Sequence, residues 1–407
     1  MYRRRKLWSR ADLLALLDVS TITSATDIDH RFHQIANTLL HGYHLVCSSG
    51  TKVDTFEVLE IEFYLLQPRC HEDPFTHGST EQQHSGRWYF HRAPRRSPVP
   101  QQTVVTAAGG YRGGTRKGLD LTFGGPVLKT SQYFAGAREH DATPNDTPSQ
   151  EVLSRDENQT RGGILLRSMR HITNGTVISG PSLLVDEILR SSGATTIAEL
   201  VSDKWNHDLT AFADVPPSHS PSLSSAPSSS ASGSQFGRPR LFFQRKGRST
   251  SHAAATGRST DIPTTKPEIY RSPRIGLDLS NSSIPTTPED ALKHPRVIYV
   301  SKLYRYFTHP RLLTANGRGQ TLLGVYLKEL ADDQNLLATP KQRDSIVNQT
   351  GLNPKIVQKY VLDFQEGYRS GAECLKKFIG SAGKGASASP ERFLKMMGAL
   401  RKLQGAS

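Results

Sequence analysis

Cysteine is scarce in this sequence: Cys47, Cys70 and Cys374 are the three thiols of a 407-residue chain. Thiols so few and so far apart exclude a disulfide scaffold and a cysteine-based zinc site, and they favour a reducing compartment. No run reaches the ~18 consecutive apolar residues that a membrane-spanning helix needs. No apolar segment typical of a signal peptide follows Met1. We therefore expect neither a membrane protein nor a secreted disulfide-rich protein.

Acidic residues are also in deficit, with 37 Asp and Glu against 51 Lys and Arg, which gives a formal net charge of +14. Such an excess favours a polyanionic partner, a nucleic acid before an anionic membrane surface. Hydrophobic residues make up 36% of the chain. This share is too low for one tightly packed domain of this length, so part of the chain is expected to be tail or linker.

Composition along the chain predicts five segments. Residues 1–28 form a basic tail with a short helix, and 29–214 form the first part of a globular core. Residues 215–265 are rich in serine, proline and basic residues, which predicts a disordered linker whose removal leaves the fold intact. Residues 266–315 close the core, and 316–407 form a helical extension. The basic residues of this extension predict either a second DNA contact or a solvated face of packed helices.

Hydrophobic periodicity assigns most elements. Alternation predicts strands where β-branched and aromatic residues gather, and spacing of three and four predicts helices. The predicted strands are 43–46, 55–64, 86–90, 119–123, 163–166, 297–300 and 303–307. The predicted helices are 181–190, 320–330, 341–349, 355–368 and 391–400, with a further helical pattern around Ile35.

Two carboxylates lie on one face of the strand at 55–64. Glu60 and Glu62 are two residues apart, and side chains two apart on a strand point the same way. If that face is buried, poor solvation raises the pKa of one carboxyl group, as a general base requires. The alternative is an edge strand whose acidic face is simply solvated.

Four histidines, His71, His77, His84 and His91, raise the question of a metal site. Their spacings of six, seven and seven match no usual zinc signature. We therefore expect surface or structural histidines and no metal.

The segment 92–117 is basic and contains no acidic residue. Tyr111 lies in it between two glycine pairs, followed by Arg112, Arg116 and Lys117. Glycines allow the backbone to approach phosphates closely, and an aromatic ring there can stack on a base or enter a duplex. These four residues are predicted to bind DNA; the alternative is a flexible basic loop.

Several segments in a fixed order resemble, in divergent form, the alkyladenine (3-methyladenine) DNA glycosylase family. The resemblance runs from about residue 29 to 313 and excludes the C-terminal extension. It is carried by 35–40 with 44–46, the Glu-x-Glu-x-Tyr strand at 58–64, His77, the aromatic strand 86–90, 163–167, the Gly-Pro-Ser helix start at 180–184, 274–277 and 304–307.

This resemblance implies an α+β fold in which helices surround a curved antiparallel sheet. It further implies base-excision repair by a monofunctional DNA glycosylase, which flips an alkylated purine out of the duplex and hydrolyses its N-glycosidic bond. Glu62 would be the catalytic base; Tyr64, His77, Tyr89 and Arg167 would bind the substrate; no cofactor or metal would be needed. The expected partner is double-stranded DNA, the expected state a monomer, and the expected compartment the nucleus, with mitochondrion or cytoplasm as alternatives.

One departure from the family bears on substrate choice. The family places an asparagine in its base pocket, on the strand that corresponds to 118–124. This sequence has none there, and Asp120 or Thr122 are the polar alternatives. Two other functions therefore stay open: a DNA-binding protein that keeps the fold without catalysis, and a metal-dependent hydrolase built on the histidines.

Overall fold

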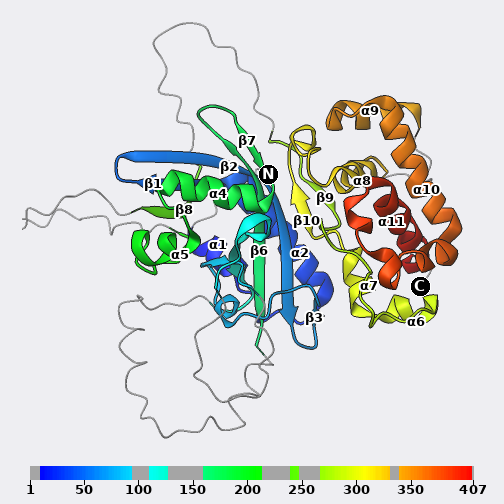
Figure 1. Cartoon of the computed structure of the whole chain (residues 1–407), viewed down its shortest axis with the longest axis horizontal. Helices are drawn as coiled ribbons and strands as arrows, with labels where there is room; N and C mark the ends of the chain where they lie inside the picture. The colour runs from blue at the N-terminus through cyan, green and yellow to red at the C-terminus, as the bar shows by residue number, and fades with distance from the viewer. Residues whose placement is uncertain are drawn as a thin grey trace, which may run out of the picture.

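A curled antiparallel sheet forms the centre of the molecule in the computed structural model, which describes residues 10–93, 110–126, 159–212, 239–246, 266–330 and 339–405 (Figure 1). The main strand order is β4-β5-β6-β2-β1-β8, with β10 between β2 and β9. One edge of β2 pairs first with β1 and then with β10, so the sheet curls into a half-barrel. Helices surround it, and the fold is α+β.

The strands are β1 Tyr43–Ser49, β2 Lys52–Gln67, β3 His71–Glu72, β4 Trp88–Phe90, β5 Leu119–Phe123, β6 Arg161–His171, β7 Val177–Ser179, β8 Arg240–Arg245, β9 Tyr270–Ser272 and β10 Arg305–Phe307. The helices are α1 Arg10–Leu17, α2 Ala25–Gly42, α4 Pro181–Ser192, α5 Ile197–Glu199, α6 Pro288–Lys293, α7 Pro295–Val300, α8 Arg318–Glu329, α9 Pro340–Thr350, α10 Pro354–Lys376 and α11 Pro390–Gln404. One of the short 3-10 helices, η2, spans Gly114–Arg116.

Alternation along β2 separates an apolar face from a polar one. Ile61, Phe63 and Leu65 are completely buried, and the ring of Phe63 stacks on Phe32 of α2 at 4.4 Å. Glu60, Glu62 and Tyr64 therefore point to the opposite face of the sheet. This alternation confirms the predicted strand and its common face for the two carboxylates.

The pairing of β2 with β6 is irregular beside Glu60. Val58 pairs with Met169, Glu60 with Ser168 and Ile61 with Leu166, so Leu59 and Arg167 each lack a paired residue. A β-bulge re-aims side chains and bends the strand locally. The irregularity brings the Arg167 guanidinium between both carboxylates.

One expectation about the linker is wrong. Residues 240–245 form strand β8, which pairs with β1, and both Leu241 and Phe243 are 3% exposed. The alternation of Leu241 and Phe243 with half-buried and exposed neighbours lets this segment complete the sheet edge. Removing 216–265 would therefore also remove part of the core. Apart from 239–246, the predicted linker at 215–265 lies outside the described residues.

We expect Phe243→Ala to lower the free energy of unfolding by about 3–5 kcal/mol, because a buried phenyl ring is lost and a cavity remains. Phe242 on the opposite face of β8 is only half-buried, so Phe242→Ala is the matched control, with a loss of about 1 kcal/mol. Urea denaturation of both variants measures the difference. Equal losses would show that β8 does not contribute to the core.

The strand predicted at 297–300 is also wrong, because these residues complete helix α7. Pro295 occupies the first helical turn, and the His294 side chain accepts a hydrogen bond from the Arg296 amide. Proline in the first turn and a side-chain cap both favour a helix start. Val297 and Val300 are buried on one helix face three residues apart, rather than alternating as in a strand.

Two expected domain boundaries differ from the packing. Leu13 and Leu17 of α1 are completely buried in the first core, so the described part of the N-terminal tail belongs to it. A second core joins the helices of the C-terminal extension to β9 and β10, where Tyr270 and Phe307 contribute (Figure 1). Leu59 of β2 also enters that second core. The C-terminal helices thus pack on the sheet and share one core with the closing segment.

Candidate functional site

A row of side chains crosses the polar face of the sheet. Glu62 pairs with Leu165, Leu165 with Asp120, and Asp120 with Tyr89, which links β2, β6, β5 and β4. Cross-strand neighbours share a face, so all four side chains lie on the face opposite the main core. At the other edge of β2, Arg305 of β10 pairs with Glu62.

The Glu62 carboxylate is completely buried and accepts three hydrogen bonds. The Tyr64 hydroxyl donates to Oε2 at 2.8 Å, and Arg167 Nη1 lies 3.3 Å from the same oxygen. The backbone amide of Ile275 donates to Oε1 at 2.7 Å. Since a carboxylate offers about four acceptor positions, one position on Glu62 stays open.

The Glu60 carboxylate is held by two arginines and a serine. It lies 2.5 Å from Arg305 Nε and 3.2 Å from Arg167 Nε, and it accepts a hydrogen bond from the Ser168 hydroxyl. Burial alone would raise the pKa of Glu60, but the charges of Arg305 and Arg167 outweigh burial and hold the pKa below its usual range. The expected raised pKa is therefore wrong for Glu60, because its burial comes with two arginines.

Tyr64 is held from two sides. Burial, reinforced by the neighbouring Glu62 charge, raises the pKa of Tyr64, so its hydroxyl stays protonated and donates to Glu62. The guanidinium of Arg274 lies 4.4 Å from the centre of the Tyr64 ring. Arg274 itself is completely buried in an ion pair with Asp73 and also donates to the Phe63 carbonyl at 3.0 Å. This pair fixes the closing segment beside β2, where the next residue, Ile275, reaches Glu62.

A second polar cluster lies on the same face around Asp120. His91 Nε2 is 2.9 Å from one Asp120 oxygen, and the Gln82 amide donates to the other at 3.3 Å. The His77 ring lies 4.4 Å from the His91 ring and meets Tyr89 edge-on at 6.0 Å. Gly163 makes room for this cluster, because a Cβ there would lie 2.4 Å from Asp120 Oδ2. Asp120, one of the two polar alternatives on this strand, therefore points into this cluster.

His77 is neutral at pH 7. Burial, together with the charge of His91, lowers the pKa of His77 to about 4. Because folding lowers this pKa below the ordinary value of 6.5, the contribution of His77 to stability is present above about pH 6.5 and is lost as the pH falls through 4. A neutral imidazole can both donate and accept a hydrogen bond.

We expect His91→Gln to raise the pKa of His77, because one of the causes that lower this pKa is removed. Asp120→Asn should lower it further, because the Asp120 charge opposes the shift. The pH titration of the His77 Cε1 proton by NMR measures both changes. Shifts of the same sign in the two variants would contradict the electrostatic explanation.

The two clusters are distinct but neighbouring. Glu62, Tyr64 and Arg167 are in direct contact, whereas His77 and Tyr89 belong to the Asp120 cluster. Three strand spacings of about 4.8 Å separate β2 from β4, or roughly 14 Å along the sheet. The predicted substrate-binding residues therefore form two groups on one face.

The four predicted DNA-binding residues differ in their burial and in their contacts. Tyr111 is half-buried, with Arg92 4.2 Å from its ring centre and Phe90 edge-on at 6.3 Å, so entry into a duplex would break both contacts. Arg112 donates to the Arg92 carbonyl at 2.8 Å. Arg116 is exposed at the end of η2, and Lys117 forms an ion pair with Asp186 of α4. Residues 94–109 of this basic segment lie outside the described residues.

A cleft of about 830 Å³ opens beside Arg167. Its walls come from η2, from the starts of α4 and α8, and from Ile275 and residues of α10 and α11. Arg167 and Ile275 both contact Glu62 and both line the cleft, which places the Glu62 network at its edge. The sequence did not indicate a role in the site for Arg305, Arg274 or Arg318. Only the pattern around Arg305 could have indicated one, since Arg305 alternates with Tyr304 and Tyr306 on a predicted strand.

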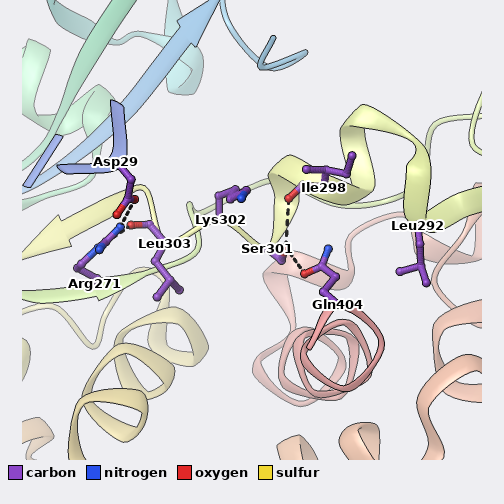
Figure 2. Close-up of a pocket in the computed structure, with 8 residues that line it drawn as sticks. All are labelled: Asp29, Arg271, Leu292, Ile298, Ser301, Lys302, Leu303 and Gln404. Carbon is purple, nitrogen blue, oxygen red and sulfur yellow. Dashed lines mark hydrogen bonds and ion pairs between the residues drawn. The ribbon is translucent and has the colours of Figure 1, made fainter. Parts of the chain in front are cut away.

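Another cavity, of about 520 Å³, lies where α2, β9, α7 and the end of α11 meet (Figure 2). Arg271 pairs there with Asp29, and the Ser301 hydroxyl donates to Gln404 at 2.8 Å. None of the predicted site residues lines this cavity. We therefore place the candidate site at the cleft beside Arg167.

Within the described part of the chain, no three His, Cys, Asp or Glu side chains gather in a way that could hold a metal ion. Across the same ranges, every helix is too short or too polar to cross a bilayer.

Comparison with known proteins gives one distant similarity. The chain is 31% identical over 169 residues to an uncharacterized protein of Acanthamoeba polyphaga mimivirus; the match spans 42% of this chain and 61% of the viral protein. No family model matches the chain, and no solved structure matches it. The site itself is therefore the basis for a function of this chain.

Proposed function

We propose that this protein is a monofunctional glycosylase that hydrolyses the N-glycosidic bond of a damaged purine in DNA. The observation that carries the proposal is the Glu62 carboxylate, held by Tyr64, Arg167 and Ile275 with one acceptor position open, at the edge of the cleft. The resemblance of the sequence to alkyladenine DNA glycosylases points to the same residue and the same reaction.

In this reaction Glu62 accepts a proton from water as the oxygen of that water attacks C1′ of the sugar. The bond between sugar and base breaks through an oxocarbenium-like state, and a nearby carboxylate stabilises the positive charge on the sugar. Arg167 and Tyr64 keep the Glu62 carboxylate oriented. Preorganised donors of this kind avoid reorganisation during the reaction.

The Asp120 cluster supplies contacts for the flipped base. Tyr89 and the neutral His77 provide one stacking surface and one imidazole that can donate or accept at a base edge. Asp120 in place of the family's asparagine favours a base that presents hydrogen-bond donors, because a carboxylate only accepts. The net charge of +14 favours DNA as the polymer that carries this base.

One observation favours a second candidate, a DNA-binding protein without catalysis. Glu62 has no solvent-exposed surface, and three donors already satisfy most of its capacity. A purely structural carboxylate would have the same environment.

The test is base release from alkylated duplex DNA. The purified protein is incubated with methylated duplex, the free bases are identified by mass spectrometry, and abasic sites are counted by strand scission in alkali. Release of a methylated purine supports the glycosylase. Tight DNA binding with no released base, on alkylated and deaminated duplexes alike, supports the second candidate.

A further inference from the structure

The cleft beside Arg167 is built by two parts of the chain that are far apart in sequence. Lys117, Arg167 and the start of α4 form one wall, and Arg318, Tyr360 and the start of α11 form the other. The second wall lies entirely in the C-terminal extension, outside the resemblance to glycosylases. Asn316 joins the walls by donating to the Ser179 carbonyl at 2.9 Å.

Three cations, Lys117, Arg167 and Arg318, line this cleft. Lys117 pairs with Asp186, and Arg167 pairs with the buried Glu60 and Glu62, so Arg318 is the lining cation that forms no ion pair with a described residue. Arg318 is exposed, and it occupies the first turn of α8, where a cation opposes the helix dipole. No acidic residue lies in the first turn of either α4 or α8 to offset this charge. The stability of α8 does not explain a cation at this position.

The cleft also offers surfaces for nucleotides. Leu183 lines it with 57% of its surface exposed, an unusual position for a large apolar side chain, and the half-buried Tyr360 faces it from the other wall. An apolar wedge and an aromatic platform between cations are the elements with which proteins hold opened or bent nucleic acid. The volume of about 830 Å³ lies within the range of pockets that hold a drug-sized ligand.

We propose that this cleft binds the phosphodiester backbone of a DNA strand, and that the C-terminal helices form its second wall. The backbone runs between Lys117 and Arg318, with Arg167 at the point where the strand reaches Glu62. The inference builds on the proposed function, because Arg167 belongs to both sites. It assigns the C-terminal extension to substrate binding in addition to packing.

The experiment compares charge changes at Arg318 in the full chain. Binding of a fluorescein-labelled DNA duplex is measured by anisotropy over a series of salt concentrations. Arg318→Glu should weaken binding on the order of tenfold and reduce the slope of log affinity against log salt by about one, as loss of one phosphate contact does. Arg318→Lys keeps the charge and should retain the slope of the native protein.

Arg401 is the matched control, since it is exposed at the far end of α11, roughly 16 Å along the helix from Pro390 in the cleft. Arg401→Glu changes the net charge equally and should leave the slope unchanged. If Arg318→Glu and Arg401→Glu weaken DNA binding equally, the proposal is wrong. It is also wrong if Arg318→Glu has the same melting temperature as the native protein and binds DNA with unchanged affinity. Anisotropy measures binding without base release. A protein that releases no base but shows this dependence on Arg318 would therefore refute the proposed glycosylase activity and still support DNA binding in the cleft.

Discussion

Glu62→Gln should lower base release from alkylated duplex by about 10²–10⁴-fold, the usual contribution of a general base. Glutamine has nearly the same shape and still accepts hydrogen bonds from Tyr64 and Arg167, but it takes no proton from water. DNA affinity should change little, because glutamine is nearly isosteric with glutamate and only the proton chemistry is lost. Single-turnover measurement of abasic-site formation separates the chemical step from binding.

Glu57 gives the matched control on the same strand. Its carboxylate pairs with Arg170, away from the cleft, so Glu57→Gln removes a similar charge from β2. Base release by Glu57→Gln should stay within about twofold of the native rate, since Glu57 neither lines the cleft nor contacts Glu62, Tyr64 or Arg167. A Glu62→Gln protein as active as the control would exclude Glu62 as the base.

Arg274→Ala should lower the free energy of unfolding by about 3–5 kcal/mol, because it leaves the Asp73 carboxylate buried without its partner. Both side chains of this pair are completely inaccessible to solvent. Arg274 also holds Tyr64 and the Phe63 carbonyl, so its loss should disturb the Glu62 network as well. Chemical denaturation measures the stability, and the rate of base release at a temperature where the variant is folded measures the network.

The pair of Arg240 and Asp208 provides the comparison for this prediction. It has nearly ordinary ion-pair geometry at 3.0 Å, but its side chains are 45% and 36% exposed. Arg240→Ala should cost no more than about 1 kcal/mol, as exposed ion pairs do. Replacing Arg274 and Asp73 together by Met and Leu should recover much of the stability, since an apolar pair leaves no buried charge. Similar losses in Arg274→Ala and Arg240→Ala would show that burial of the Arg274 pair has no energetic role.

Patterns of residues within single strands and helices were sufficient to predict many elements of this fold. Alternation in 55–64 predicted that Glu60 and Glu62 share a face, because neighbouring side chains on a strand point to opposite sides. The same local logic gave the strands 119–123 and 163–166 and the four C-terminal helices. The alternation of residues 240–245 was also local, but the serine-rich composition around it concealed strand β8.

Only the tertiary structure decided the electrostatics of the candidate site. Arg305 reaches Glu60 across 245 residues, and Arg274 reaches Asp73 across 201 residues. No local pattern carries such information, since the pKa of a buried carboxyl group depends on which charges the fold brings within a few ångströms. For the same reason, the sequence alone did not show where the C-terminal helices pack. In the fold, Arg318 and Lys117 line the same cleft. The sequence determined which side chains share a strand face; long-range packing determined which charges meet there.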